Sequence, residues 1–402
     1  MQPIERPQYL NQLIDLQGKD VIKVVTGIRR SGKSTLFQLF INHLLANGVD
    51  QNDIFSYNFE DFALQPYLDN PLQLHEELIG AASAGRQIYV FLDEVQNIKQ
   101  FERLVDSLHL RPNIDVYVTG SNAFLLSGEL ATLLTGRYIE IHVLPFSFKE
   151  YMEIRADKPF ADLPFNDYVN DGGFPGMFAL PEPLRKNYIR DIYSSILQKD
   201  ILVRNAWRKA DHFDRLVRFM LDSIGSPLSA NKISNTFKTL GFQISNHTVE
   251  TYLDAICESY MFYKVPRYNI KGKTILSTQE KYYTADLGLK ATILGQPAHT
   301  NIGHNLENIV FLELMRRGCT VWTGKSDEHE IDFVVQTRNG ETQYIQVAYT
   351  AKEESTLHRE LLPLQKIKDN HRKILLTTDE FEFNNAGIEQ LNVGRWLLNG
   401  TQ

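Results

Sequence analysis

Apolar and polar positions alternate along residues 1–150 in a manner typical of a layered α/β domain. Short runs rich in β-branched and aromatic residues predict buried strands at 21–25, 54–59, 88–92, 114–119 and 139–144. Between the strands, apolar residues recur at helical spacing, as over 36–45 and 72–82. Parallel strands need connections of the helix-containing kind, so this alternation predicts an α/β fold built on a parallel sheet.

The first predicted strand runs into a glycine-rich loop. Residues 27–34 match the pattern G-x-x-x-x-G-K-[ST], and a strand before and a helix after are the context that a phosphate-binding loop requires. Glycines let backbone N–H groups turn toward phosphates, and the helix adds its positive amino-terminal end. We therefore predict that the chain binds a nucleoside triphosphate. The alternative is a chance glycine- and lysine-rich turn before a surface helix.

The side chains of the loop define the predicted cofactors, ATP and Mg²⁺. Lys33 is expected to reach the β- and γ-phosphates, and the Ser34 hydroxyl to hold Mg²⁺. The sequence does not assign a contact to Arg29 or Arg30. The nucleotide, a neighbouring subunit and solvent are the three alternatives. The predicted cofactor-binding residues are Gly27, Ile28, Arg29, Arg30, Ser31, Gly32, Lys33, Ser34, Thr35 and Asp93, and the predicted metal ligands are Ser34 and Asp93.

An acidic pair ends the third predicted strand. Asp93 is expected to hold Mg²⁺ through water, and Glu94 to polarise the attacking water. Two acids at a strand end are also common where there is no catalysis, but the neighbouring loop makes that alternative weaker. The second acid favours hydrolysis over phosphoryl transfer to a metabolite.

Three more residues complete the predicted catalytic set. Ser121 and Asn122 follow the next strand, where a polar side chain reaches the γ-phosphate or the attacking water; a plain Gly-Ser-Asn turn fits equally well. Arg137 precedes the fifth strand and is expected to stabilise the transferring phosphoryl group, within the chain or across a boundary between subunits of a homo-oligomer. A surface arginine is the alternative. The predicted catalytic residues are Glu94, Lys33, Arg137, Ser121 and Asn122.

In this order, the motifs resemble prokaryotic AAA-superfamily P-loop ATPases that carry an uncharacterised C-terminal domain of nuclease-like fold. The resemblance implies an ATPase but supplies no substrate. It rests on residues 26–35, 89–97, 118–123, 135–138, 145–151, 172–175, 281–289, 305–318 and 330–333.

The middle of the chain is predicted to hold a helical lid (151–205) and a winged-helix domain (206–300). Three helical segments precede two alternating segments joined by a turn, as in a winged helix. Residues 199–273 carry twelve Lys or Arg and seven Asp or Glu, so 12 − 7 = +5 in a chain of net charge −7. Duplex DNA is therefore a candidate partner, and a protein-docking module is the alternative. The candidate DNA contacts are Asn246, His247, Lys264, Arg267, Lys271 and Lys273.

The last predicted domain, residues 301–402, has the helix and strand order of the PD-(D/E)XK nuclease core, which it resembles. The resemblance assigns Glu307 and Asp332 to metal binding. Its Glu-x-Lys element is replaced, because Gln346 and Ala348 stand where the acid and the lysine belong. Loss of a metal carboxylate and of the ammonium predicts a nuclease-like domain without cleavage activity, used for recognition or assembly.

The remaining sequence features bear on where the protein acts and not on the reaction that it carries out. The start lacks a leader-like segment and no apolar run reaches membrane-spanning length, so a cytoplasmic protein without a membrane partner is expected. The leading hypothesis is a hydrolysing AAA-type ATPase that acts as a nucleotide-driven switch, with DNA as one candidate partner. The alternatives are a nucleotide-gated DNA- or protein-binding scaffold with little turnover and, last, an ATP-dependent DNA-processing nuclease.

Overall fold

The computed structural model describes residues 4–83, 85–123, 136–155, 165–203, 210–297, 299–326 and 329–399. The chain divides into two compact units. The first holds Met1–Pro145 and Glu258–Tyr260, and the second holds Phe146–Cys257 and Met261–Gln402. Within the described ranges, every helix is too short or too polar to cross a bilayer.

The first unit is built on a five-stranded sheet in the order β2-β3-β4-β1-β5, and all of its strand pairs are parallel. This confirms the predicted α/β fold with a parallel sheet. The strands are β1 (Ile22–Thr26), β2 (Ile54–Asn58), β3 (Ile88–Asp93), β4 (Ile114–Gly120) and β5 (Tyr138–His142).

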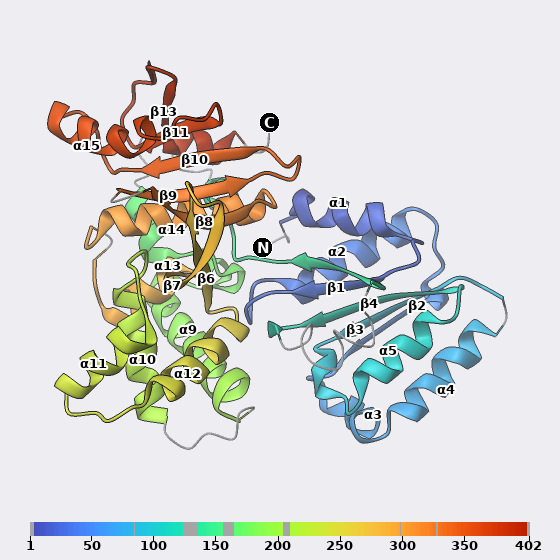
Figure 1. The fold of residues 1–402 in the computed structure, drawn as a ribbon. Coiled ribbons are helices and arrows are strands. Elements are labelled where there is room, and N and C mark those ends of the chain that lie inside the picture. Colours follow the sequence, from blue (N-terminus) through green and yellow to red (C-terminus); the bar gives the residue numbers. More distant parts are fainter. Residues whose placement is uncertain are drawn as a thin grey trace. The chain divides into compact units, whose positions relative to one another are not determined.

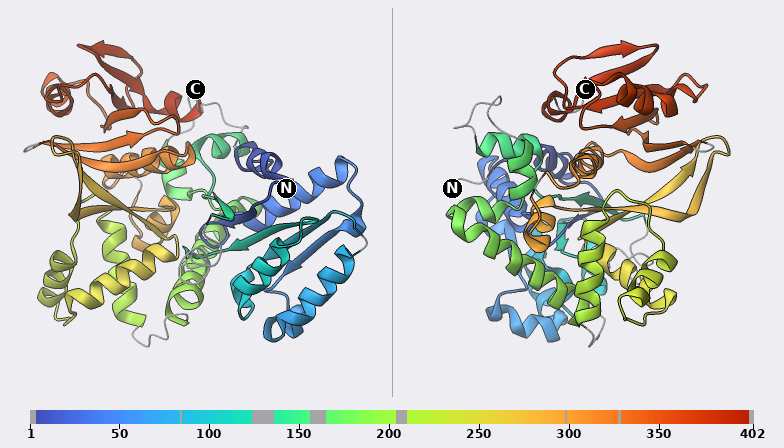
Figure 2. Two further views of the ribbon diagram at one scale, coloured as in Figure 1. Left: turned by 45° about the vertical axis from the view of Figure 1, so that its right-hand side comes forward. Right: turned by 90° about the vertical axis from the view of Figure 1, so that its left-hand side faces the viewer.

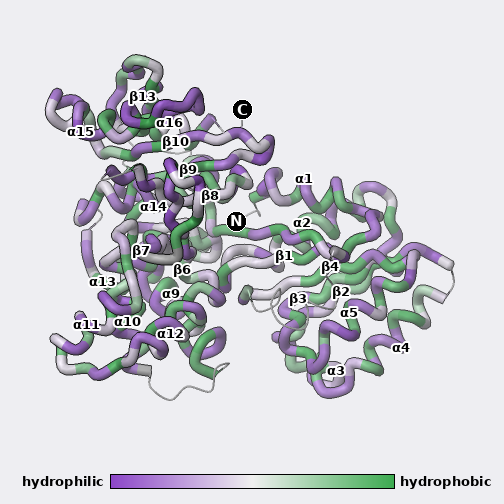
Figure 3. Tube along the Cα trace, in the orientation of Figure 1, coloured by the Kyte–Doolittle hydropathy of each residue, from purple (hydrophilic) through white to green (hydrophobic). Residues whose placement is uncertain are grey.

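Helices cover both faces of this sheet (Figure 1). One face carries α1 (Pro7–Leu16) and α2 (Lys33–Ala46), and the other carries α4 (Pro71–Ala82) and α5 (Phe101–His109). The short helix α3 (Gln65–Asp69) precedes α4. Figure 3 shows the pattern behind this layering: β3 is hydrophobic along most of its length, whereas α5 alternates between hydrophobic and hydrophilic residues.

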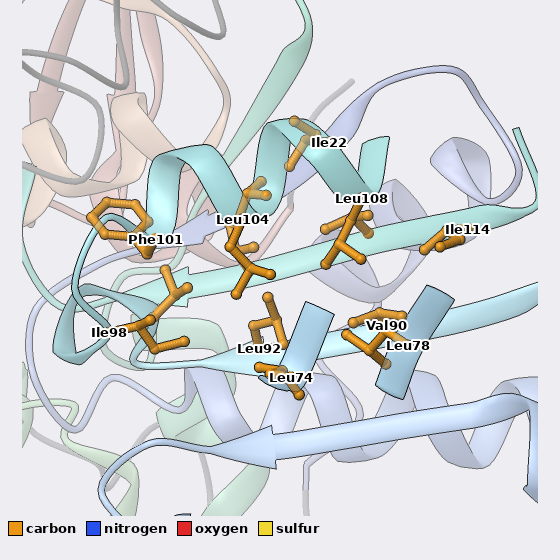
Figure 4. Close-up of a cluster of buried hydrophobic side chains, with 14 of the residues drawn as sticks. Ile22, Leu74, Leu78, Val90, Leu92, Ile98, Phe101, Leu104, Leu108 and Ile114 are labelled. Atoms are coloured by element: carbon orange, nitrogen blue, oxygen red, sulfur yellow. The ribbon is translucent and has the colours of Figure 1, made fainter. Parts of the chain in front are cut away.

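The core under α4 and α5 fixes the sheet from one side. Leu104 and Leu108 of α5 and Leu78 of α4 point toward Val90 and Leu92 of β3 (Figure 4). All five side chains are at most 5% exposed. Fully burying such a side chain contributes about 1.5–3 kcal/mol, so this layer holds β3 and its acidic end in a defined place.

The second unit contains the remaining helices and one large sheet. Its helices are α7 (Phe148–Ile154), α8 (Phe165–Asp171), α9 (Glu182–Ser195), α10 (Ala210–Asp222), α11 (Ala230–Thr239), α12 (Asn246–Glu258), α13 (Leu287–Leu294), α14 (Ile302–Arg316), α15 (Glu354–Gln365) and α16 (Val393–Leu398). The helical segment that begins at Glu182 continues to Val203, but its form changes, because α9 passes directly into a π-helix over Ile196–Val203. Residue 204 lies outside the described residues.

The sheet of the second unit has eight strands in the order β12-β13-β11-β10-β9-β8-β6-β7. They are β6 (Phe262–Asn269), β7 (Thr274–Thr284), β8 (Thr320–Ser326), β9 (His329–Gln336), β10 (Thr342–Val347), β11 (Arg372–Thr377), β12 (Phe383–Asn385) and β13 (Ile388–Asn392). From α14 to β11, the order of helices and strands is the one that the sequence predicts. The nuclease-like assignment itself stays a prediction.

The predicted hairpin exists, but it is not an isolated wing. β6 and β7 pair with each other, and β6 also pairs in parallel with β8 (Figure 2). One sheet therefore includes strands from both sides of residue 300, where the sequence predicts a domain boundary. The division into lid, winged-helix and nuclease-like domains stays a prediction.

A glycine turn between α8 and the 3₁₀ segment Pro175–Ala179 is packed against two other segments of the second unit. The Gly173 N–H donates to the buried carboxyl of Asp286 at 2.6 Å, and its carbonyl accepts from Phe146 N at 2.7 Å. Burial raises the pKa of Asp286 to about 7, although backbone N–H groups that bond its carboxyl oppose the rise. The turn leaves no room for a side chain at Gly173, because a Cβ there would overlap the Phe146 carbonyl oxygen.

Replacing this glycine is expected to destabilise the protein. In Gly173→Ala the new methyl group forces the backbone near Phe146 to move, and overpacking of this kind costs about 1–3 kcal/mol. Gly303→Ala is the matched control, since a Cβ at that helical position meets nothing within 4 Å. Thermal unfolding should show a clearly lower melting temperature for Gly173→Ala only, and equal values would contradict the packing described here.

Candidate nucleotide-binding site

The phosphate-binding loop lies between the end of β1 and the start of α2. Gly27 has a φ of 141°, and a Cβ there would overlap the Val143 carbonyl oxygen, so the position requires glycine. Gly32 also has a positive φ, of 101°, and directly precedes Lys33, the first residue of α2. The loop thus opens onto the amino end of a helix, where backbone N–H groups and the helix dipole favour an anion.

Lys33 holds its ammonium group at this loop. The side chain is almost completely buried, and Nζ donates to the carbonyl oxygens of Gly27 at 3.0 Å and Ile28 at 3.3 Å. The same nitrogen lies 3.7 Å from Oε1 of Glu94. The structure therefore brings the loop lysine close to Glu94, the residue that follows β3.

Asp93 ends β3 with its carboxylate among hydroxyl and amide donors. Thr119 and Ser34 donate hydroxyl hydrogen bonds to it, and Asn58 Nδ2 donates at 3.1 Å. Burial raises the pKa of Asp93, and the two hydroxyl bonds oppose that rise. The Ser34 and Asp93 oxygens lie side by side, and such an all-oxygen pair suits Mg²⁺, so the residues fit the predicted metal.

Glu94 has a strained backbone and a well-held side chain. Its φ of 54° is left-handed, a conformation that costs a non-glycine residue about 1–3 kcal/mol and is found often at functional sites. Its carboxylate accepts from Gln96 Nε2 at 2.6 Å and Ser121 Oγ at 2.9 Å. Burial opposes ionisation, but Lys33, Gln96, Arg29 and Ser121 together outweigh it and lower the pKa of Glu94.

The structure buries both residues predicted to sense the nucleotide, Ser121 and Asn122, directly after β4. Ser121 contacts Glu94 directly. Asn122 is also buried, at 3% exposed. Two residues that the sequence reading missed lie closer to the chemistry: Thr119 and Asn58, the polar residues near the ends of β4 and β2, both bond Asp93. The sequence did carry a signal for both residues, since each is a polar residue near the end of a strand whose carboxyl end meets the same edge of the sheet.

Arg137 does not lie at this site. Its carbonyl oxygen accepts from Ile22 N, at the amino end of β1, and its guanidinium pairs with Asp106 of α5 at 2.8 Å. Parallel strands run in one direction, so the amino end of β1 is the edge opposite the loop that begins at Gly27. The prediction that Arg137 acts within its own chain is therefore wrong, and a role across a subunit boundary stays a prediction.

A second group of titratable residues lies in the second unit. Asp332 of β9 accepts from the Val347 N–H at 2.9 Å, and Gln346 of β10 accepts from the Asp332 N–H at 3.3 Å. Burial raises the pKa of Asp332 to about 8, and the nearby Glu307 carboxylate contributes. The predicted nuclease-like residues Glu307, Asp332 and Gln346 thus belong to one region of the structure.

An ammonium group that the sequence reading did not find sits among these acids. Lys281 of β7 is 3% exposed, and its Nζ lies 2.9 Å from Glu307, 2.8 Å from Glu330 and 3.7 Å from Asp332. These carboxylates outweigh burial and raise the pKa of Lys281. The inference that Ala348 leaves the site without an ammonium is corrected here. Across the described residues, no three His, Cys, Asp or Glu side chains are arranged to hold a metal ion.

The candidate DNA contacts divide into two groups. Asn246 and His247 are exposed at the start of α12, and Lys273 is exposed at the hairpin turn next to Lys271. By contrast, Lys264 pairs with Glu280 at 3.1 Å, and the Arg267 guanidinium lies 3.5 Å from Glu330. Those two cations are partly neutralised within the second unit.

Comparison with known proteins agrees with the geometry of the first unit. A family model described as an AAA domain matches residues 19–152. Two models of domains of unknown function follow, DUF8612 at 163–300 and DUF4143 at 302–395. Among solved structures, a Walker-type ATPase of Pyrococcus abyssi has a TM-score of 0.50 at 15% identity, over 72% of this chain and 95% of that chain, which is a likeness of fold.

Two relatives cover nearly the whole chain. An uncharacterised protein of Methanocaldococcus jannaschii is 28% identical over 389 residues, which are 92% of this chain and 84% of that protein. An uncharacterised protein of Haemophilus influenzae is 39% identical over 401 residues, 98% of each chain. The chain therefore belongs to the same family as the Haemophilus influenzae protein, and its N-terminal part is an AAA-type P-loop ATPase domain.

Proposed function

We propose that the protein hydrolyses ATP, bound with Mg²⁺, and uses the cycle as a nucleotide-driven switch. The observation that carries the proposal is the convergence of Lys33, Asp93 and Glu94 at the carboxyl edge of one parallel sheet. Lys33 would hold the β- and γ-phosphates, and Ser34 and Asp93 would hold Mg²⁺. When bound, the metal neutralises phosphate charge and orients the γ-phosphate.

Glu94 is the residue proposed to orient the attacking water and take its proton. Its lowered pKa keeps the carboxylate ionised at neutral pH, and Gln96 and Ser121 fix its direction. One hydroxyl links the two acids, since Thr119 Oγ1 donates to Asp93 and accepts from the Glu94 N–H at 2.9 Å. The proposed metal ligand Asp93 and the proposed general base Glu94 are thus held in fixed positions relative to each other. This arrangement supports hydrolysis over a nucleotide-gated scaffold with little turnover.

For the acidic group of the second unit we propose a structural role. Lys281 neutralises part of the charge of Glu307, Glu330 and Asp332, and it joins β7 to α14 and β9. Gln346 at the place of the third acid supports a domain for recognition or assembly, so we do not propose nuclease activity. Duplex DNA stays a candidate partner through Asn246, His247, Lys271 and Lys273.

Replacing Glu94 tests hydrolysis directly. In Glu94→Gln the general base is lost, so steady-state ATP turnover should fall about 10²–10⁴-fold while ATP binding remains. Glu76→Gln is the control, because this exposed glutamate of α4 lies outside the site. Stoichiometric ATP binding by the natural chain without turnover would instead support the scaffold.

Removing the buried ammonium tests the structural role of Lys281. Lys281→Met takes the ammonium partner from the buried carboxylate of Glu307 and should cost about 3–5 kcal/mol of stability. The loss should be larger at pH 8 than at pH 5, since burial raises the pKa of Asp332 to about 8, and this carboxyl is protonated at the lower pH and then carries no charge to compensate. Lys264→Met is the control, because that half-exposed pair with Glu280 is worth about 0–1 kcal/mol. Equal melting temperatures of the two variants would count against the role.

Salt dependence tests the DNA candidate. If the hairpin turn contacts phosphates, affinity for duplex DNA should fall steeply with added salt, and removing Lys271 and Lys273 together should reduce the log–log slope by about 2. Lys366→Ala with Lys368→Ala removes the same charge from exposed positions outside 206–300 and should leave the slope unchanged. Affinity that does not depend on salt, or no binding, would exclude this partner.

A further inference from the structure

The two consecutive arginines of the phosphate-binding loop have different surroundings. Arg30 is exposed and has a left-handed backbone with a φ of 67°. Arg29 is only 9% exposed, and its Nη1 lies 2.7 Å from Oε1 of Glu60. The structure therefore turns one arginine toward solvent and holds the other within the protein by a charged partner.

Glu60 places Arg29 at the catalytic edge of the sheet. It lies two residues beyond the end of β2, and the intervening Phe59 donates its N–H to the carbonyl oxygen of Asp93 at 3.0 Å. The guanidinium is also close enough to Glu94 to favour its ionised form, together with Lys33. Arg29 is thus held between the acids that follow β2 and β3, Glu60 and Glu94, at the edge of the sheet where we propose that ATP is hydrolysed.

Two other arginines of the first unit are less suited to this task. Arg137 lies at the opposite edge of the sheet and pairs with Asp106. Arg6 approaches the loop, but its guanidinium donates to the carbonyl oxygens of Ser31 and Leu144 and so supports the backbone. Hydrolysis by P-loop enzymes gains about 10³–10⁵ in rate from an arginine at the transferring group, whether it comes from the same chain or from another.

We propose that Arg29 is a catalytic residue that contacts the γ-phosphate from within its own loop, with Glu60 as its positioning residue. The inference rests on the proposed ATP hydrolysis. As the water oxygen bonds to the γ-phosphorus, the bond to the bridging oxygen of ADP breaks and the water proton goes to Glu94. Negative charge then spreads over the γ-oxygens, where Arg29 stabilises it. A guanidinium has five N–H donors in a planar fork, enough for a carboxylate and a phosphate together.

Kinetics of Arg29 variants test the assignment. Arg29→Gln and Arg29→Lys should lower kcat about 10²–10³-fold, because neither side chain reproduces the fork, while the Kd for MgATP changes less than about tenfold. Millimolar guanidinium ion should restore part of the turnover of Arg29→Ala. Arg86→Gln is the control, since the half-exposed Arg86 forms an ion pair with Asp53 at 3.1 Å away from the site.

Glu60→Gln tests whether Glu60 positions the Arg29 side chain for catalysis or only stabilises the fold. If Glu60 aims Arg29, kcat should fall about tenfold with KM nearly unchanged, as expected for an interaction made in the transition state. If the pair only stabilises the fold, both variants lower the melting temperature, kcat stays at the natural value and guanidinium rescues nothing. That outcome overturns the proposal.

ATP turnover by the natural chain distinguishes failure of the proposed function from failure of the role of Arg29. If it does not turn over ATP, the proposed function fails and the role of Arg29 fails with it. If it turns over ATP and the Arg29 variants keep its rate, only the role of Arg29 is overturned. If it turns over ATP and the variants bind MgATP without hydrolysing it, both proposals are supported.

Discussion

Because β1, β3 and β4 pair in parallel, their carboxyl ends meet at one edge of the first sheet. The phosphate-binding loop follows β1, the acidic pair ends β3, and Thr119 and Ser121 lie at the end of β4. Each strand therefore delivers its polar residues to the same place without a contribution from distant loops. Apolar layers on both faces keep the strands in register, so the position of each carboxylate is set by the core beneath it.

Buried charge is the second feature of this edge. Asp93 and Glu94 are both largely buried, and adjacent carboxylates in such surroundings are costly unless cations or hydrogen bonds compensate them. The compensation differs between them: Asp93 receives hydroxyl and amide donors, whereas Glu94 lies near two cationic groups. This difference matches a metal ligand beside a general base. It also explains why an arginine inside the loop is useful before any nucleotide arrives.

Local patterns were sufficient to predict the phosphate-binding loop at residues 27–34, because its strand, loop and helix follow one another in the sequence. Asp93 and Glu94 were predicted from a second local pattern, an apolar run that ends in two acids. The role of Arg137 within its own chain was wrongly expected, because a residue just before a strand of a parallel sheet lies at the amino edge, opposite the phosphate-binding loop. Lys281 was missed for a different reason: Glu330 of β9 reaches it because β6 pairs with β8, and Glu307 reaches it because α14 packs against β7, and no short-range pattern encodes either contact. Thr119 was included in a strand, but its hydroxyl was given no role.

The central claim is that this edge of the sheet activates water against the γ-phosphate of ATP. Phosphate release by the natural chain with Mg²⁺ in ¹⁸O-labelled water tests it most directly. The account predicts many phosphates per chain, each with an oxygen from the solvent. Release of at most one phosphate per chain, or of phosphate without the label, would contradict it.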